Sequence, residues 1–375
     1  ITILIIGGPD VNARIKLINK LKGDYDFICF GSSNEIKKDF QRSNIGYYYY
    51  KLNLNFNFLI DFYSLYSIIK LIRTISPKIV HTFDTKPGLI GRLAARICSV
   101  PIIIGTLPGL GVLYSSEKKL IRMFRLFYQF VIKIVCELST STVFQNPDDR
   151  KLFLEKGIIK DSNSQIILGS GIDTNYFSME KLKSSNLRKI RKSIGCENDD
   201  IVVTMVTRII RSKGIQEFSN VAKRMNNNKV KFLLVGEYDP DDKNTFTKGE
   251  FENICDNIIW LGFRSDIREI MALSDIIALP TFYREGIPRV LLEGASLNKP
   301  LISTDAPGCR EIIENGKNGY LIMPRDEEEL KISIERLVSS PTERKRMGDL
   351  SRKLAVNNFD ISRVVDAHKK LYNNL

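Results

Sequence analysis

Short apolar runs in the first half of the chain alternate with longer segments in which apolar residues recur every three or four positions. Continuous apolar runs are typical of buried parallel strands, and the longer period is typical of helices that pack on a sheet. Strands are expected at residues 1–6, 26–30, 47–50, 79–83, 100–106, 139–146 and 165–168, and helices at 56–72, 89–97 and 117–137. The pattern predicts a parallel sheet covered by helices.

The same alternation restarts at residue 201. Further strands are expected at 201–206, 230–235, 257–261, 275–279, 300–304 and 319–323, with helical segments between most of them. Gly169-Ser170-Gly171 is a plausible hinge, and the polar stretch 176–200 reads as a connecting segment. Two blocks of this kind predict an α/β protein with two Rossmann-like, doubly wound domains that face a central cleft. We expect the domains to span 1–170 and 171–359, with a C-terminal helix in 360–375 that crosses back to the first.

Composition adds an uneven charge distribution to this picture. Residues 1–168 hold 23 Lys and Arg against 13 Asp and Glu, so most of the net charge of +13 belongs to the first half. Such a balance implies an anionic partner, either acidic lipid or a phosphorylated acceptor, with nucleic acid as the competing idea. The positive charge is spread over helices without interleaved aromatic residues, which argues against nucleic acid.

No apolar run reaches the length of a membrane-spanning helix, and no secretory signal is visible. The six Cys form no C-x-x-C pair, so reduced thiols in a cytoplasmic protein are the simplest interpretation. The segment 117–137 is apolar but carries Lys118, Lys119, Arg122, Arg125 and Lys133. It could lie on an anionic membrane surface, or it could pack on the core with a solvated basic edge.

Candidate chemistry in the second half starts with Glu285 and Glu293. Pro288 is suited to the first turn of a helix, so Glu285 is expected on a strand-to-helix loop and Glu293 inside the helix. Glu293 shares a helix side with apolar residues, where a carboxylate needs a partner. The alternative is an ordinary salt bridge from Glu293 to Arg289, four residues earlier.

Two cations follow the strand at 201–206. Arg208 and Lys213 lie on the next strand-to-helix loop, where they could bind a diphosphate, or they could be solvated surface charges. The loop 304–311 emerges at the same edge of the sheet, because the carboxyl ends of parallel strands share one edge. These cations and the two glutamates can therefore converge on a nucleotide-sugar.

The first half offers weaker candidates. Gly7-Gly8 ends the first strand and allows a ligand to approach the backbone closely, although a plain turn is the alternative. His81 lies near the carboxyl end of a parallel strand and is a candidate catalytic residue, with a satisfied core histidine as the alternative. We expect His368, in a polar C-terminal helix, to lie on the surface.

Several spaced motifs occur together in the second half. They are Arg208-x4-Lys213-Gly214, Phe232-Leu233-Leu234-Val235-Gly236, Glu285-x7-Glu293, Pro307-Gly308-Cys309-Arg310-Glu311 and Asn318-Gly319. With these motifs the second half resembles the retaining glycosyltransferases of family 4, which have the GT-B fold. The first half is similar more loosely, through Gly7-Gly8, through His81-Thr82-x3-Lys86-Pro87-Gly88-Leu89-x-Gly91-Arg92 and through Val143-Phe144-Gln145-Asn146.

The resemblance implies a role for each matching residue. Arg208 and Lys213 would bind the donor diphosphate, Glu293 the ribose, and Glu285 the transferred sugar. The backbone of Gly7 and Gly8 would approach the donor phosphates. Gly286 and Ile287 are expected to bind substrate beside Glu285, and Gly262-Phe263-Arg264 is the candidate contact for the base.

The resemblance also implies a reaction. It is the transfer of a hexose or N-acetylhexosamine from a UDP-sugar to a lipid-linked saccharide, with retention, in polysaccharide synthesis. In many members a loop like 106–111 has a His before its Gly, where this chain has Pro108. Gly109-Leu110-Gly111 instead resembles the subset that extends sugars on a polyprenyl diphosphate. No metal or other cofactor is expected, and the enzyme is expected at the inner face of the membrane. A nucleotide-sugar epimerase of the same architecture is the alternative.

Overall fold

The computed structural model describes residues 1–53, 57–115, 119–242 and 244–375. The chain divides into two compact units, one made of Ile1–Gly169 with Ser362–Leu375 and the other of Ser170–Ile361. At the first crossing, Gly169 and Gly171 both have positive φ, of 63° and 71°. Glycine adopts this conformation without the penalty that other residues incur.

The first unit is built on a parallel sheet of seven strands in the order β3-β2-β1-β4-β5-β6-β7. Its strands are β1 (Thr2–Ile6), β2 (Asp26–Gly31), β3 (Gly46–Tyr49), β4 (Ile79–Phe83), β5 (Ile102–Leu107), β6 (Ser141–Phe144) and β7 (Ser164–Ile166). Every residue of β4, β5 and β6 is buried, as expected for a sheet that helices cover on both faces.

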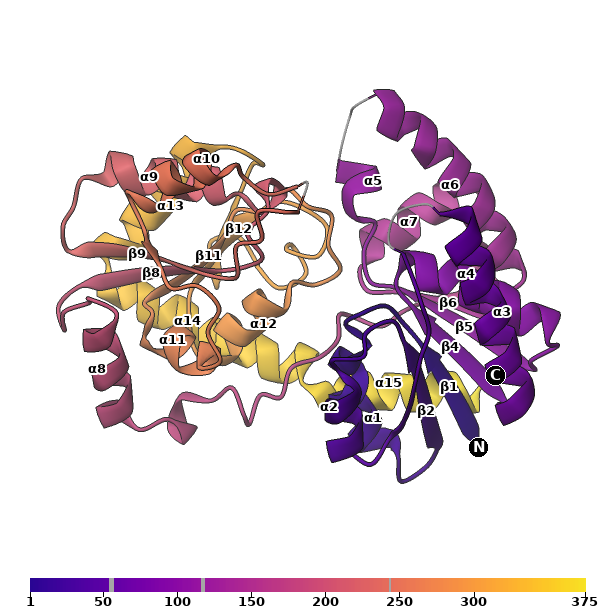
Figure 1. Ribbon diagram of the computed structural model, residues 1–375. Coiled ribbons are helices and arrows are strands. Elements are labelled where there is room, and N and C mark those ends of the chain that lie inside the picture. Colours follow the sequence, from indigo (N-terminus) through magenta and orange to yellow (C-terminus); the bar gives the residue numbers. More distant parts are fainter. Residues whose placement is uncertain (54–56, 116–118, 243) are drawn as a thin grey trace. The chain divides into compact units, whose positions relative to one another are not determined.

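Helices return the chain between these strands. They are α1 (Ile15–Leu21), α2 (Lys37–Arg42), α3 (Phe58–Ile75), α4 (Thr85–Ile97), α5 (Gly111–Ser115), α6 (Lys119–Glu137), α7 (Pro147–Glu155) and α15 (Ile361–Asn373), with the short 3-10 helices η1 (Val11–Arg14) and η2 (Asp161–Asn163). In Figure 1, α3, α4 and α6 lie along one side of the sheet. Asn57 begins α3, since its side chain accepts a hydrogen bond from the amide of Ile60 at 3.1 Å.

The second unit has a parallel sheet of six strands in the order β10-β9-β8-β11-β12-β13. Its strands are β8 (Ile201–Val206), β9 (Val230–Val235), β10 (Ile259–Trp260), β11 (Ile276–Leu279), β12 (Leu301–Thr304) and β13 (Gly319–Ile322). Its helices are α8 (Ser184–Ser193), α9 (Ile215–Met225), α10 (Lys248–Cys255), α11 (Ile267–Leu273), α12 (Arg289–Ser296), α13 (Glu327–Ser339) and α14 (Pro341–Phe359), with the 3-10 helices η3 (Met179–Lys181) and η4 (Arg211–Lys213).

The two parallel α/β sheets confirm the fold class expected from the sequence. The sequence analysis expected no helix at the positions of α1, α2, α5 and α7, and two further helices differ from the expectation. Helix α4 begins at Thr85, earlier than expected, because Pro87 is tolerated in a first helical turn. The expected connecting segment 176–200 contains α8, which has no fully buried residue. Of the expected helices, Phe56, Glu117 and Lys118 lie outside the described residues.

The C-terminal helix α15 packs on the first unit. The Tyr25 hydroxyl donates to Asn373 Oδ1 at 2.7 Å, and Lys369 pairs with Asp24 at 2.6 Å. His368 is only 4% exposed, so the expectation of a surface residue is wrong. Its Nδ1 lies 2.8 Å from the carbonyl oxygen of Val364, and its ring centroid lies 5.7 Å from that of His81. His368 is therefore on the buried face of a helix whose sequence is mostly polar.

Candidate active site

Strand-to-helix loops of the second unit meet at the carboxyl edge of its sheet. The loops at 207–214, 280–288 and 305–310 follow β8, β11 and β12, which are neighbouring strands. The amide of Phe282 donates to the carbonyl oxygen of Ser212 at 3.0 Å, which joins the first loop to the second. The carboxyl edge of an open α/β sheet is where ligands bind, and the expected donor residues lie here.

Lys213 and Glu285 form an ion pair between two of these loops. Lys213 Nζ lies 2.6 Å from Glu285 Oε1, and the two side chains are 9% and 18% exposed. The Thr281 hydroxyl donates to the same carboxylate oxygen at 3.3 Å. Low exposure strengthens such a pair relative to a surface salt bridge, so it fixes the position of both groups.

Tyr283 connects this pair to Arg208. Lys213 Nζ lies 5.2 Å from the centroid of the Tyr283 ring, which allows a cation–π contact. Burial raises the pKa of Tyr283, and the Arg208 guanidinium, which is hydrogen-bonded to the phenol, opposes that rise. Arg208 is itself exposed. The structure thus gathers Arg208, Lys213, Tyr283 and Glu285 into one cluster with two cations.

Two glycines allow the loops to approach this closely. A Cβ atom at Gly308 would lie 1.5 Å from the carbonyl oxygen of Gly286, and one at Gly214 would lie 2.1 Å from that of Pro280. Both glycines have positive φ, of 90° and 82°. Gly286 and Ile287 are buried at this junction. The positions next to Glu285 therefore depend on backbone-to-backbone contact that no larger residue permits.

Glu293 lies in α12, which follows directly after Pro288. Its side chain is 13% exposed and lies 3.4 Å from Arg289 Nη2. The salt bridge that the sequence offered as an alternative is therefore present. One partner of this ion pair is exposed to solvent, since the Arg289 side chain is 43% exposed. A ligand with neutral hydroxyl groups could compete for the Glu293 carboxylate at little cost, because such exposed pairs are weak.

The candidate base contact follows β10. Gly262 has a φ of 64°, and its carbonyl oxygen accepts a hydrogen bond from the amide of Gly236 at 2.9 Å. Phe263 is 76% exposed. Arg264 makes two hydrogen bonds to Asp266, at 2.8 and 2.7 Å, which raise its pKa. This leaves the Phe263 ring as the accessible group of the segment.

In the first unit, Gly7 and Gly8 follow β1 and are buried. The Gly8 amide donates to Asp84 Oδ2 at 3.2 Å, and the Tyr50 hydroxyl donates to the carbonyl oxygen of Gly7 at 3.0 Å. Burial raises the pKa of Asp84, and Asp10 adds to that rise. The Gly8 amide thus points at a carboxylate, which has the same charge as the phosphate it is expected to meet.

His81 lies in the interior of the first unit. It is 0% exposed, and its Nδ1 and Nε2 lie 2.8 Å from the Tyr372 hydroxyl and 2.7 Å from the Thr106 hydroxyl. Burial and nearby positive charge lower its pKa well below the ordinary value, so the ring is neutral. This placement matches the alternative of a satisfied core histidine, and we leave His81 out of the catalytic set.

The sequence did not single out Thr281 and Tyr283. Both precede Glu285 on the same loop, at a spacing of two residues, so they follow the side-chain period of the strand that ends at Leu279. That spacing was the available signal. Within the described ranges, no group of three or more His, Cys, Asp and Glu is arranged to hold a metal ion. In the same ranges, no helix is both long and apolar enough to span a bilayer.

Comparison with known families decides the class. Residues 187–354 match the family of group 1 glycosyl transferases, and residues 10–146 match the glycosyl transferase 4-like family. The chain is a family 4 glycosyltransferase. The first match contains the whole Arg208, Lys213, Tyr283 and Glu285 cluster.

Two relatives match along most of their length. The UDP-Gal:alpha-D-GlcNAc-diphosphoundecaprenol alpha-1,3-galactosyltransferase of Escherichia coli is 27% identical over 325 residues, which are 85% of this chain and 81% of the relative. The N,N'-diacetylbacillosaminyl-diphospho-undecaprenol alpha-1,3-N-acetylgalactosaminyltransferase of Campylobacter jejuni is 25% identical, and the match covers 98% of this chain and 96% of the relative.

Solved structures share the GT-B fold. A glycosyltransferase from Rickettsia africae superposes with a TM-score of 0.83 at 21% identity, over 100% of this chain and 98% of the other. The Anabaena protein HepE in complex with UDP-glucose superposes with a TM-score of 0.82 at 18% identity, over 100% of both chains. At these identities the likeness concerns the fold.

Proposed function

We propose that this glycosyltransferase moves a hexose or N-acetylhexosamine from a UDP-sugar to a hydroxyl group of a saccharide carried on a polyprenyl diphosphate. The observation that carries the proposal is the partly buried Lys213–Glu285 pair beside Arg208 at the carboxyl edge of the second sheet. It combines fixed cations for a diphosphate with a carboxylate for sugar hydroxyls. The second unit is then the donor unit, and the first is the acceptor unit.

Charge stabilisation is the main contribution of these residues. As the bond from the sugar to the UDP oxygen breaks, negative charge grows on the leaving diphosphate, and Arg208 and Lys213 oppose it with positive charge. Glu285 holds Lys213 at 2.6 Å and so keeps the ammonium group oriented before the donor arrives. Glu285 acts here as a positioning group toward the transferred sugar.

Retention follows from the resemblance to family 4. A phosphate oxygen of the donor removes the proton of the acceptor hydroxyl on the face that UDP leaves, so no side chain serves as base or nucleophile. Glu293 binds the ribose hydroxyls, and the exposed ring of Phe263 offers a stacking surface for the uracil. Metal independence is part of this proposal, and activity in EDTA tests it.

The acceptor class rests on the relatives and on the first unit. The Escherichia coli and Campylobacter jejuni enzymes are both named for acceptors on diphosphoundecaprenol, and each match covers more than four-fifths of the relative. A polyprenyl diphosphate combines an anionic group with an apolar chain. The excess of Lys and Arg in residues 1–168 complements the anionic diphosphate, and an exposed apolar surface complements the apolar chain.

That surface consists of exposed apolar side chains on α3 and α6, two helices that both contact α4, and we call it the α3–α6 apolar surface. Its members are Phe58, Leu59, Phe62, Tyr63 and Tyr66 on α3 with Leu120, Met123, Phe124, Phe127 and Phe130 on α6, each at least half exposed. They lie toward the N-terminal ends of the two helices. Because a helix that follows a parallel strand starts at the carboxyl edge of the sheet, both groups are near the edge where ligands bind.

Cations flank the apolar residues of α6. Lys119, Arg122 and Lys133 are exposed on this helix, while Tyr128, Ile132 and Cys136 are buried on its opposite face. An apolar face with a basic edge is the pattern of a helix that lies in the interface of an anionic bilayer. The enzyme therefore binds the inner face of the membrane peripherally, where its lipid-linked acceptor is held.

A transfer assay tests the proposal. The purified enzyme is incubated with each of a panel of UDP-hexoses and UDP-N-acetylhexosamines and with a short-chain polyprenyl diphosphate saccharide. We expect one donor to extend the acceptor by one sugar, with the anomeric proton of the product reporting retention by NMR. An incubation without acceptor detects the epimerase alternative. Absence of transfer from every donor, under conditions where UDP raises the melting temperature, would contradict the proposal.

A further inference from the structure

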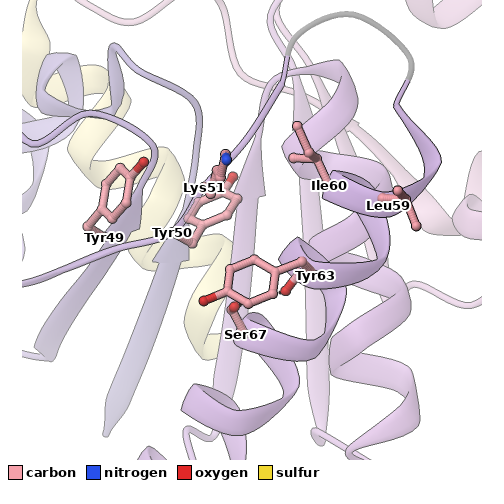
Figure 2. Close-up of a pocket in the computed structure, with 7 residues that line it drawn as sticks. All are labelled: Tyr49, Tyr50, Lys51, Leu59, Ile60, Tyr63 and Ser67. Carbon is pink, nitrogen blue, oxygen red and sulfur yellow. Dashed lines mark hydrogen bonds between the residues drawn. The ribbon is translucent and has the colours of Figure 1, made fainter.

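A cavity of about 480 Å³ lies in the first unit between the end of β3 and the first half of α3. It is lined by Tyr49, Tyr50 and Lys51 on the strand side and by Leu59, Ile60, Tyr63 and Ser67 on α3. Figure 2 shows the ring of Tyr63 extending from the helix toward Tyr50. Its volume is within the range of small-molecule sites, roughly 300–1,000 Å³. None of the site residues expected from the sequence lines it.

The lining combines aromatic faces with hydroxyl groups. Tyr63 and Tyr49 are 57% and 46% exposed, so ring faces and phenol groups are accessible to a ligand. Tyr50 is 2% exposed and its hydroxyl donates to Gly7, so it forms the floor. A pyranose has an apolar face of C–H groups and an edge of hydroxyl groups. Tyrosine, with an apolar ring and a polar tip, complements both.

The charge of the lining residues further limits the class of ligand that the cavity could bind. Lys51 contributes an exposed ammonium group, and the described lining residues include no carboxylate. The phenols of Tyr49 and Tyr63 and the ammonium group of Lys51 would lose hydration against a hydrocarbon chain, so a purely apolar occupant is disfavoured. A sugar that carries a phosphate satisfies the rings, the hydroxyl groups and the cation together.

The cavity also adjoins the α3–α6 apolar surface, since Leu59 and Tyr63 belong to both. The protein thus brings aromatic rings and a cation together in this cavity, with exposed apolar side chains beside it. A polyprenyl diphosphate saccharide presents a sugar, then a diphosphate, then an apolar chain. The geometry points to this cavity as the subsite for the diphosphate-linked sugar of the acceptor, stacked on Tyr63 with Lys51 at the diphosphate. This inference rests on the proposed function and assigns the acceptor a position.

Steady-state kinetics of Tyr63→Ala test the stacking contact. With a short-chain polyprenyl diphosphate saccharide in detergent, we expect the acceptor KM to rise about tenfold, while kcat and the donor KM stay unchanged. Tyr63→Phe should retain most of the acceptor affinity, because the ring remains. Tyr48→Ala is the matched control, since Tyr48 is 49% exposed on β3 but neither lines the cavity nor belongs to the α3–α6 apolar surface. Equal effects of Tyr63→Ala and Tyr48→Ala, or a rise in the donor KM, would overturn the inference.

A second variant tests the charge. Lys51→Gln should weaken a saccharide diphosphate severalfold and leave an uncharged glycoside acceptor unaffected, whereas Lys70→Gln, exposed farther along α3, should change neither. Calorimetric binding of the same acceptor without donor separates this inference from the proposed function. If wild-type protein binds the acceptor and Tyr63→Ala does not, the subsite stands even where no transfer is found. If both proteins bind it equally, the subsite is wrong even where transfer is found.

Discussion

The Lys213 ammonium group and the Glu285 carboxylate share one partly buried ion pair, so neither acts alone in the proposed donor site. Removing one member leaves the other with an unbalanced charge at low exposure, which adds to the cost of the lost contact. Tyr283 and Thr281 hold the pair from the loop side. The residues of the proposed donor site are therefore coupled, and their contributions to activity are not expected to add.

A double-mutant cycle measures this coupling. Lys213→Ala should lower kcat by about 100- to 1,000-fold, since it removes a cation from the leaving diphosphate. Glu285→Ala should also lower kcat, in part because Lys213 is no longer held. We expect the double variant to lose clearly less activity than the product of the two single losses. Single effects that multiply fully in the double variant would show that the two residues act independently.

Among individual residues, the sequence predicted those charged side chains that come directly after a buried strand. Arg208, Lys213 and Glu285 follow buried strands, and strand ends meet at one edge. The spacing of Tyr283 from Glu285 could have pointed to it, but its contacts could not be predicted, because they depend on the path of the loop backbone. His368 was placed wrongly because its burial depends on packing between segments almost 300 residues apart, which the polar residues beside it in α15 conceal.

Among the elements, the loops of the second unit are held by contacts between backbones. Gly308 lies against the carbonyl groups of Gly286 and Glu285, so one loop supports the loop that carries the carboxylate. A continuous apolar run predicts a strand well, and the sequence located all the strands that surround this site. It could not predict which glycine touches which carbonyl group, since that depends on three loops at once.

Gly308→Ala tests this support. The added Cβ would lie 1.5 Å from the Gly286 oxygen at a φ of 90°, so the loop must move. We expect a loss of about 3 kcal/mol in unfolding free energy and a weaker affinity for UDP, measured by urea denaturation and calorimetry. Gly316→Ala is the control, because Gly316 has a φ of 77° but nothing within 4 Å of its Cβ position. Equal losses in both variants would mean that only the backbone angle matters.

Helix α15 gives the first unit a dependence on pH. Burial lowers the pKa of His368 to about 4, from an ordinary value of 6.5. Both it and His81 therefore favour the neutral form in the folded state. The unfolded chain binds more protons between these values, so stability is fully present above pH 6.5 and is lost as the pH falls toward 4. The loss at pH 5.5 is about 1.4 kcal/mol for His368, and the lowered pKa of His81 adds a loss in the same direction.

His368→Leu isolates one of the two histidines. Its Nε2 is buried without a hydrogen-bond partner, so a leucine removes a titrating group without leaving a new unpaired atom at that position. We expect the urea midpoint of the variant to fall less than that of the wild type between pH 7.5 and 5.5. If the urea midpoint falls by the same amount between pH 7.5 and 5.5 in the variant and in the wild type, His368 does not titrate in the unfolding reaction.

For the molecule as a whole, charge and exposed apolar surface are concentrated in the first unit. The excess of cations lies in residues 1–168, and the α3–α6 apolar surface lies in the same part of the chain. The sequence predicted the charge asymmetry and an apolar, basic helix at 117–137, but not which side of that helix is covered. That depends on which residues the neighbouring elements bury, here Tyr128, Ile132 and Cys136.

Vesicle binding tests the role of this surface. Replacing both Phe127 and Phe130 with Ser should lower co-sedimentation with phosphatidylglycerol vesicles at least about tenfold, because each ring buries apolar area in the bilayer. Binding of the wild type should weaken as salt is raised. Met323→Ser is the control, since Met323 is 61% exposed in the second unit. If the Phe variant binds vesicles like the wild type but changes from dimer to monomer, the surface instead joins two copies of the chain.

The C-terminal helix belongs to the first unit, although the residues just before it belong to the second. During synthesis on a ribosome, Ser170–Ile361 is a continuous segment that can complete its fold as soon as it has emerged. Most of the first unit emerges earlier, but it cannot complete its fold until α15 is present, because the buried His81 ring is hydrogen-bonded to the hydroxyl of Tyr372. A chain that ends before α15 therefore holds all of the second unit but an incomplete first unit, in which His81 lacks the hydroxyl of Tyr372.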